Sequence, residues 1–234
     1  EFQGFRAAQR EGGLAVLPWR AAWLEATAQG VAAQASAPGP DEGRFGQALV
    51  HMQKSRPATW HDLGQAWARL EPGGRLLLCG GNDLGITSAV KRLARELEQT
   101  PRVLANRRHA RIVAFERGSG PGPASAQPTK ILLPLPDESN RELHAEPGVF
   151  SAKKLDVGTE LLLATLGDQP APRRILDLGC GVGPLALAAL VRWPEAQALL
   201  LDGDVRAVSS ATQNAAAMGL DSRSQIAWWD AEEV

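Results

Sequence analysis

The sequence has few of the residues and runs that mark secreted, metal-binding or membrane proteins. Its only two cysteines, Cys79 and Cys180, each lie in an apolar run beside a glycine. We therefore expect two buried thiols rather than a disulfide, and a reducing, cytoplasmic setting. The four histidines show no ligand-like spacing with cysteines or carboxylates, so no metal is expected. No apolar stretch approaches the roughly 18 to 20 uncharged residues that span a bilayer, and no charged-then-apolar leader is visible.

The sequence also lacks a charge excess, because its net charge is only -1. No overall field would attract nucleic acid, so RNA binding would need a local basic patch. One candidate is a basic cluster over a short stretch of the first half: Lys91, Arg92, Arg95, Arg102, Arg107, Arg108, His109 and Arg111. These side chains could form a phosphate-contacting face, or a solvated helix face balanced by Glu96 and Glu98, and the sequence leaves both interpretations open.

Apolar periodicity in the first half predicts alternating helices and strands of an α/β fold. We expect helices over 19–29, 60–70 and 86–97, and strands over 48–52, 75–79 and 110–115. Residues 118–128 combine glycine, proline and serine without periodicity, which predicts a linker. We therefore assign residues 1–117 to a first domain and 118–150 to a linker and connecting segment, with little to assign over 1–43.

The pattern restarts after Phe150. We expect helices over 155–166, 185–191 and 207–218, and strands over 174–178, 198–201 and 225–229. Consecutive strand-helix-strand units predict a mostly parallel sheet. We assign residues 151–234 to a second α/β domain.

The most informative run is residues 175–183, where three alternating glycines follow a strand and precede a helix. Gly179, Gly181 and Gly183 would let the backbone pass close to a nucleoside cofactor. A dinucleotide-binding loop would carry glycine or alanine at the position of Pro184. Asp177 would attract the cationic ammonium group of S-adenosylmethionine and repel a pyrophosphate. The alternative is a tight structural turn with a capping aspartate.

Acidic residues end the two following strands. Asp202 is expected to accept hydrogen bonds from both ribose hydroxyls, with Asp204 as a competing candidate. Either could instead cap the following helix. Asp230 could accept the exocyclic amine of adenine while the Ala231 N–H meets a ring nitrogen, although a surface-turn aspartate is nearly as plausible.

Three runs together resemble the bacterial 16S rRNA (guanine-N2-)-methyltransferases: Pro147-Gly-Val-Phe-Ser151, Leu155 to Leu163, and Ile175 to Gly183. The resemblance implies a class I S-adenosylmethionine-dependent methyltransferase with two methyltransferase-like domains, the first degenerate and the second catalytic. The first copy here matches a degenerate one, because strand 48–52 runs into Gln53-Lys-Ser-Arg-Pro57 where an active copy would carry Asn-Pro-Pro-aromatic.

The family resemblance implies methylation of guanine N2 in ribosomal RNA, with ribosomal RNA or the small ribosomal subunit as partner. The Asn-Pro-Pro-aromatic run that would hold the target amine occurs nowhere in this sequence. We therefore expect the catalytic residues beyond Val234, and no activity from the 234-residue chain alone. The alternatives are a methyltransferase for another substrate, such as large-subunit rRNA or a protein, and a non-catalytic RNA-binding module with a vestigial fold.

Overall fold

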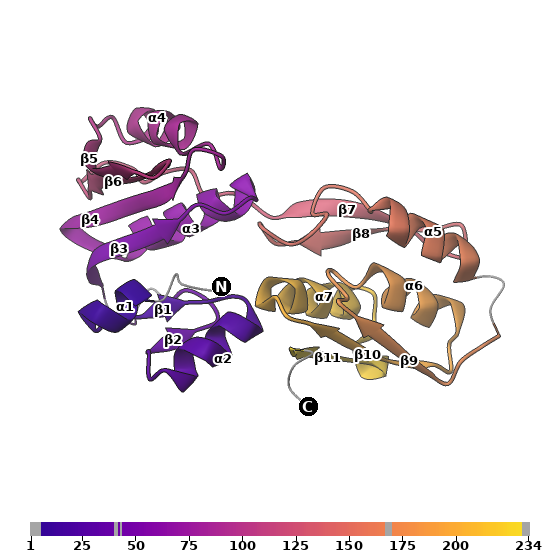
Figure 1. The fold of residues 1–234 in the computed structure, drawn as a ribbon. Helices are drawn as coiled ribbons and strands as arrows, with labels where there is room; N and C mark the ends of the chain where they lie inside the picture. Colours follow the sequence, from indigo (N-terminus) through magenta and orange to yellow (C-terminus); the bar gives the residue numbers. More distant parts are fainter. Residues whose placement is uncertain (1–5, 40–41, 43, 167–169, 231–234) are drawn as a thin grey trace. The chain divides into compact units, whose positions relative to one another are not determined.

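The computed structural model describes residues 6–39, 42, 44–166 and 170–230, which form two compact units (Figure 1). Unit 1 consists of residues 1–36 and 128–234, and unit 2 consists of residues 37–127. The division differs from the predicted one, because residues 1–36 pack with the C-terminal half of the chain rather than with the first domain.

Unit 2 is a four-stranded sheet with two helices. In chain order its elements are β3 (Phe45–His51), α3 (Arg56–Arg69), β4 (Leu70–Gly81), α4 (Ile86–Glu96), β5 (Arg102–Arg107) and β6 (Ala110–Glu116). The strand order is β3-β4-β6-β5, with β3 and β4 parallel and the remaining neighbours antiparallel. One apolar core joins both helices to the sheet through Trp60, Leu63, Leu78, Leu93 and Val113. The tryptophans Trp60 and Trp67 are buried there.

Two features of unit 2 differ from the sequence prediction. Residues 72–74, which separate the predicted helix 60–70 from the predicted strand 75–79, lie inside β4, opposite an irregularity in its pairing with β3. The glycine- and proline-rich run, expected to be a flexible linker, packs on α3: Pro123 is buried, and a Cβ at Gly122 would overlap the ring of Trp67. Its composition reflects close packing against a helix as much as freedom from structure.

Unit 1 has a parallel three-stranded sheet, ordered β11-β10-β9, and two smaller β-structures. Its N-terminal elements are α1 (Arg6–Glu11), β1 (Ala15–Val16), α2 (Arg20–Ala28) and β2 (Ala33–Gln34). Then come the hairpin strands β7 (Thr129–Pro134) and β8 (Asn140–Ala145), and α5 (Val157–Thr165). The remaining elements are β9 (Arg174–Leu178), α6 (Pro184–Arg192), β10 (Gln197–Asp202), α7 (Val205–Ala217), the short 3-10 helix η2 (Asp221–Arg223) and β11 (Ser224–Trp228). These elements confirm the predicted strand-helix order of this half.

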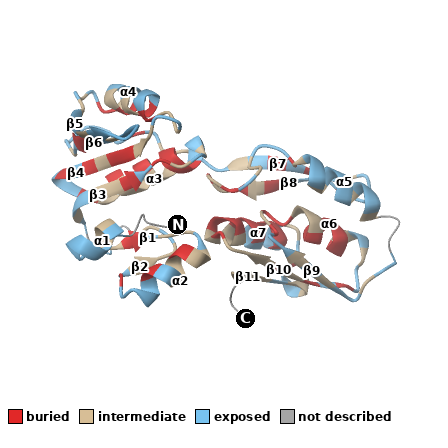
Figure 2. Cartoon of the chain, viewed as in Figure 1, coloured by how far each residue is buried: buried red, intermediate tan, exposed pale blue. Residues whose placement is uncertain are grey.

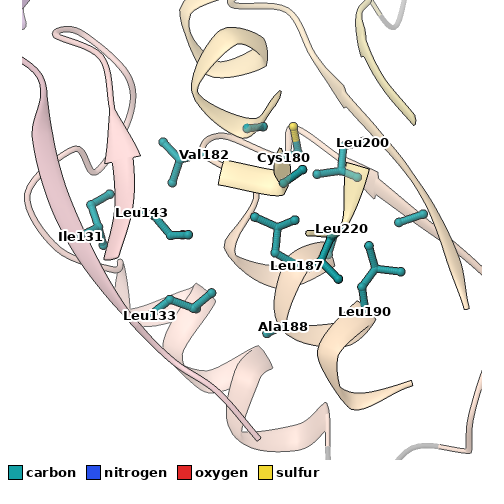
Figure 3. Packing of buried hydrophobic residues seen from close by; sticks show 14 of the residues in the cluster. Ile131, Leu133, Leu143, Cys180, Val182, Leu187, Ala188, Leu190, Leu200 and Leu220 are labelled. Carbon is teal, nitrogen blue, oxygen red and sulfur yellow. The ribbon is translucent and has the colours of Figure 1, made fainter. Parts of the chain in front are cut away.

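The helices α6 and α7 lie between the β7–β8 hairpin and the three-stranded sheet (Figure 1). Figure 3 shows Ile131, Leu133 and Leu143 of the hairpin facing Leu187 of α6 and the loop residue Val182. All five belong to one buried cluster. Residues 129–145, predicted as a connecting segment, are therefore part of the core of unit 1.

The sheet of unit 1 is buried on one side only. Figure 2 marks many positions of α6 and α7 as buried, whereas the other face of β9 carries Leu176 and Leu178, which are 59% and 60% exposed. On β9, which is at one edge of the sheet formed by the described residues, only the side chains that face the helices are shielded.

Candidate functional site

The glycine loop connects β9 to α6 at the carboxyl end of the sheet. Gly179, Gly181 and Gly183 have φ values of +72°, +56° and +88°, in the left-handed region that favours glycine. The loop is anchored to the next strand, because the Gly179 and Cys180 N–H groups donate to the Leu201 carbonyl at 2.8 and 3.1 Å. Pro184 then occupies the first turn of α6, where its missing N–H leaves no bond unmade.

The three glycines have different surroundings. A Cβ built on Gly179 or Gly181 would meet no atom within 4 Å. A Cβ on Gly183 would lie 3.2 Å from Leu187 and 3.3 Å from Leu200. Gly183 is therefore required for packing between the helix and the sheet, whereas Gly179 and Gly181 expose backbone to open space that a ligand can occupy.

Asp202, at the end of β10, lies against this loop. Its Oδ2 accepts a hydrogen bond from the Gly181 N–H at 2.9 Å, and its Oδ1 accepts one from the Asp204 N–H at 2.8 Å. Asp204 is 3% exposed, caps α7 by accepting the Arg206 N–H, and pairs with the Arg206 guanidinium at 2.7 Å. Its carboxylate is thus committed to the helix N-terminus, which leaves Asp202 as the acid that faces the loop.

Asp177 points from β9 toward the N-terminus of α6, where its Oδ2 accepts a hydrogen bond from the Ala186 N–H at 3.2 Å. The capping role that the sequence offered as an alternative is therefore present. Burial raises the pKa of the Asp177 carboxyl, and the nearby Asp202 charge raises it further, against the opposing effect of the Ala186 bond. Burial also raises the pKa of the adjacent Cys180 thiol, which keeps this cysteine protonated.

The raised pKa of Asp177 makes the stability of unit 1 depend on pH. The pKa of an aspartate in the unfolded chain is about 3.8, and that of the folded Asp177 is higher. The folded state binds more protons within this window, so the free energy of unfolding falls as pH rises through it. We expect Asp177→Asn, which keeps an acceptor for the Ala186 N–H, to raise the urea midpoint at about pH 7 and to flatten its decline from about pH 4.

Asp221→Asn is the matched control for this measurement, because Asp221 is exposed and lies outside the loop. It should leave the pH profile of the urea midpoint unchanged. An Asp177→Asn protein that is no more stable than the parent at neutral pH would show that ionising the half-buried Asp177 carboxyl does not destabilise the fold.

The two residues predicted to contact adenine, Asp230 and Ala231, follow β11 in the sequence. Asp230 is half-buried, and the Trp229 N–H donates to the Asp202 carbonyl at 3.0 Å, which brings this end of the chain next to β10. Ala231 lies outside the described residues. The assignments of Asp230 and Ala231 to adenine stay predictions.

Asn214 is a positioning residue that the sequence analysis missed. It is 2% exposed on α7, donates from Nδ2 to the carbonyls of His144 and Val182 at 3.0 Å each, and accepts the His144 N–H at 2.7 Å. It therefore links the glycine loop to β8. The available signal was a polar residue on the apolar face of α7, between Ala211 and Ala215.

The basic cluster divides into two parts. On α4, Arg92 pairs with Glu96 at 2.6 Å and stacks over the ring of Trp60 at 4.1 Å, as in the balanced helix face. On the β5–β6 hairpin, Arg107 and Arg108 are exposed, and neither forms an ion pair among the described residues. The hairpin arginines are thus available to a phosphate, as are Lys91 and Arg95 of α4, which are exposed and form no ion pair within the described ranges either.

Two kinds of site are absent from the part of the chain that the structure describes. No three His, Cys, Asp or Glu side chains come together there as a metal ion would need. Within the same ranges, no helix is long and apolar enough to cross a membrane.

Known protein families match both halves of the chain. The family model described as "Methyltransferase small domain N-terminal" matches residues 15–123, and "Methyltransferase small domain" matches residues 140–233. A ribosomal RNA small subunit methyltransferase C of Pseudomonas paraeruginosa is 38% identical over 181 residues, which cover 76% of this chain and 53% of that protein. Its counterpart in Pseudomonas aeruginosa is 36% identical over 219 residues, covering 89% of this chain and 64% of that protein.

A solved structure is also similar. The 16S rRNA N2 methyltransferase of T. thermophilus, solved in complex with AdoMet and guanosine, superposes with a TM-score of 0.82 at 25% identity, covering 94% of this chain and 60% of that one. The chain thus spans between about half and two thirds of the length of these relatives.

Proposed function

Because this chain belongs to the bacterial 16S rRNA (guanine-N2-)-methyltransferase family, we propose that it carries the S-adenosylmethionine site of an enzyme that methylates guanine N2 in small-subunit ribosomal RNA. The class I methyltransferase fold expected from the sequence is confirmed by the TM-score of 0.82. The relatives supply the substrate class. The arrangement of the glycine loop supplies the argument for the cofactor.

The observation that carries the proposal is the contact between the loop and Asp202. The Gly181 N–H lies 2.9 Å from the Asp202 carboxylate, beside open space at both Gly179 and Gly181. A carboxylate has about four acceptor positions, and two are used here, so it retains capacity for two ribose hydroxyls. The half-buried Asp177, on the strand that leads into the loop, suits a cationic ammonium group, which would favour its ionised form.

S-adenosylmethionine supplies an electrophilic methyl group on sulfur. The residues of this chain would bind and orient it: the backbone of Gly179 and Gly181 along the loop, Asp177 at the ammonium group, Asp202 at the ribose, and Asp230 with Ala231 at adenine. Direct transfer depends mainly on holding the amine about 3 Å from the methyl group and in line with the sulfur. We assign no residue of this chain to the target amine, since the family run for that role is absent from it.

The β5–β6 hairpin is the surface that we propose for contact with the RNA backbone. It carries Arg102, Arg107 and Arg108, which are exposed, and its tip consists of Arg108 and His109, both with positive φ. Arginine forms strong charge-assisted hydrogen bonds with phosphate oxygens. A net charge of -1 leaves such a local patch as the main source of attraction for RNA.

The proposed function is tested in a protein that carries this sequence and has the full length of the relatives, called here the full-length protein. Two glycine variants of it form a matched pair. Gly181→Ala and Gly219→Ala both force alanine into a left-handed conformation, at φ of +56° and +66°, with no atom within 4 Å of the added Cβ. We expect only Gly181→Ala to abolish S-adenosylmethionine binding and methyl transfer, because only its methyl group would occupy the ligand space. The readouts are calorimetry with S-adenosylmethionine and transfer of labelled methyl to undermethylated small ribosomal subunits.

The outcomes separate the candidate functions. Label at one guanine N2 supports the proposal, and label in large-subunit rRNA or protein instead would identify a different substrate. Binding of RNA without any affinity for S-adenosylmethionine would favour a non-catalytic module and contradict the proposal. In a separate titration with ribosomal RNA at several salt concentrations, the double replacement of Arg107 and Arg108 by glutamine should weaken RNA binding and lower its salt dependence, while calorimetry shows unchanged cofactor affinity.

A further inference from the structure

The N-terminal segment of the chain lies directly on the turn that follows Asp202. The Val205 N–H donates to the Pro18 carbonyl at 2.9 Å, and the Arg20 N–H donates to the Gly203 carbonyl at 2.8 Å. Between these two bonds, Trp19 forms an isolated antiparallel bridge with Asp204. The backbone of residues 18–20 therefore pairs with that of residues 203–205, directly after the end of β10.

This contact places an aromatic ring next to the proposed ribose ligand. Ring carbons of Trp19 lie 3.8 and 4.0 Å from the position that a Cβ on Gly203 would take, and Gly203 directly follows Asp202. The Trp19 side chain is nevertheless 47% exposed. One part of the ring therefore rests on the backbone of Gly203, while the rest faces outward beside the carboxyl ends of β10 and β11.

Neighbouring side chains hold the segment in place. The Arg20 guanidinium carbon lies 5.1 Å from the ring centre of Trp23 and 4.9 Å from that of Trp228, and the two rings are 5.6 Å apart. Trp228 also donates from Nε1 to the Gly203 carbonyl at 2.9 Å. The Gly203 carbonyl thus accepts hydrogen bonds from both α2 and β11, and these bonds hold the backbone on either side of Trp19 against the sheet.

We propose that Trp19 forms one wall of the adenosine end of the cofactor site, which makes the N-terminal segment part of that site. This inference rests on the proposed function, since it takes Asp202 as the ribose ligand. Gly203 directly follows Asp202, and the end of β11 lies beside it through the Trp229 N–H bond to the Asp202 carbonyl, so the base of a nucleoside held at Asp202 would have these residues as neighbours. The missing side chain of Gly203 lets the Trp19 ring pack on this backbone, and the exposed part of the indole offers a base a stacking face.

The test compares three variants of the full-length protein by calorimetry with S-adenosylmethionine and with adenosine. We expect Trp19→Ala to weaken both ligands by about tenfold, the order that loss of one base-stacking aromatic produces. Trp19→Phe should keep most of the affinity. Val16→Ala, at an exposed apolar position of the same segment, should have no effect.

Fluorescence gives a second readout that does not depend on Trp19→Ala folding well. Cofactor addition should change the tryptophan emission of the parent protein, and this change should largely disappear in Trp19→Phe although the ligand still binds. Unchanged affinity in Trp19→Ala, or an unchanged fluorescence response in Trp19→Phe, would overturn the inference while leaving the proposed function intact. Failure of the parent protein to bind S-adenosylmethionine would instead overturn the proposed function.

Discussion

Replacing Asp202 with alanine is expected to weaken S-adenosylmethionine binding by about a hundredfold or more, since hydrogen bonds to a charged group contribute roughly 1.5 to 3 kcal/mol each. Two such bonds to ribose hydroxyls would be lost. The same substitution removes the acceptor of the Gly181 and Asp204 N–H groups, so the loop also loses its link to the end of β10. Calorimetry on the full-length protein measures the change in affinity.

Two further variants separate ribose binding from loop order. Asp221→Ala removes an exposed carboxylate of the same unit and should leave the affinity unchanged. Asp202→Asn keeps an acceptor for the Gly181 N–H but removes the charge, and should fall between the parent and Asp202→Ala. Affinity within about threefold of the parent for Asp202→Ala, less than the roughly 1 kcal/mol of one net hydrogen bond, would exclude Asp202 as the ribose ligand.

Replacing Asn214 with alanine is expected to lower the free energy of unfolding by about 3 kcal/mol, because a buried polar group left without its partner costs roughly 1 to 3 kcal/mol. The side chain makes three hydrogen bonds, to the His144 N–H and to the carbonyls of His144 and Val182. The Val182 carbonyl belongs to the glycine loop, so S-adenosylmethionine binding should weaken together with stability. Urea denaturation followed by far-UV circular dichroism measures the first effect.

Gln213→Ala is the control for Asn214. Gln213 is exposed on the same helix, and its side chain donates to the Ser209 hydroxyl at 3.3 Å, one turn away on the helix surface. The substitution should change the free energy of unfolding by less than about 0.5 kcal/mol, as expected for a surface position. A loss under about 1 kcal/mol for Asn214→Ala would show that water or local rearrangement replaces the three bonds.

The sequence determined the parts of this protein that depend on near neighbours. The strands β9, β10 and β11 and the helices between them were predicted to within a few residues, because an apolar period is a local property. The loop of Gly179 and Gly181 was predicted for the same reason, since three alternating glycines after a strand indicate a tight turn with accessible backbone, and the structure adds that their φ values are positive.

Tertiary structure decided what depends on residues that are distant in the sequence. The β7–β8 hairpin was predicted as a connecting segment, and it became core only because α6 and α7 cover Ile131 and Leu143. The sequence favoured Asp202, at the strand end, as the ribose ligand and kept Asp204 as a competing candidate. The loop N–H of Gly181 and the guanidinium of Arg206 assign them to different roles.

The placement of Trp19 against Gly203 depends on a contact between segments that are more than 180 residues apart in the sequence. Periodicity shows which face of an element is apolar, but not which other element covers that face. Hydrogen bonds and packing between distant residues make that choice, and they exist only once the chain has folded.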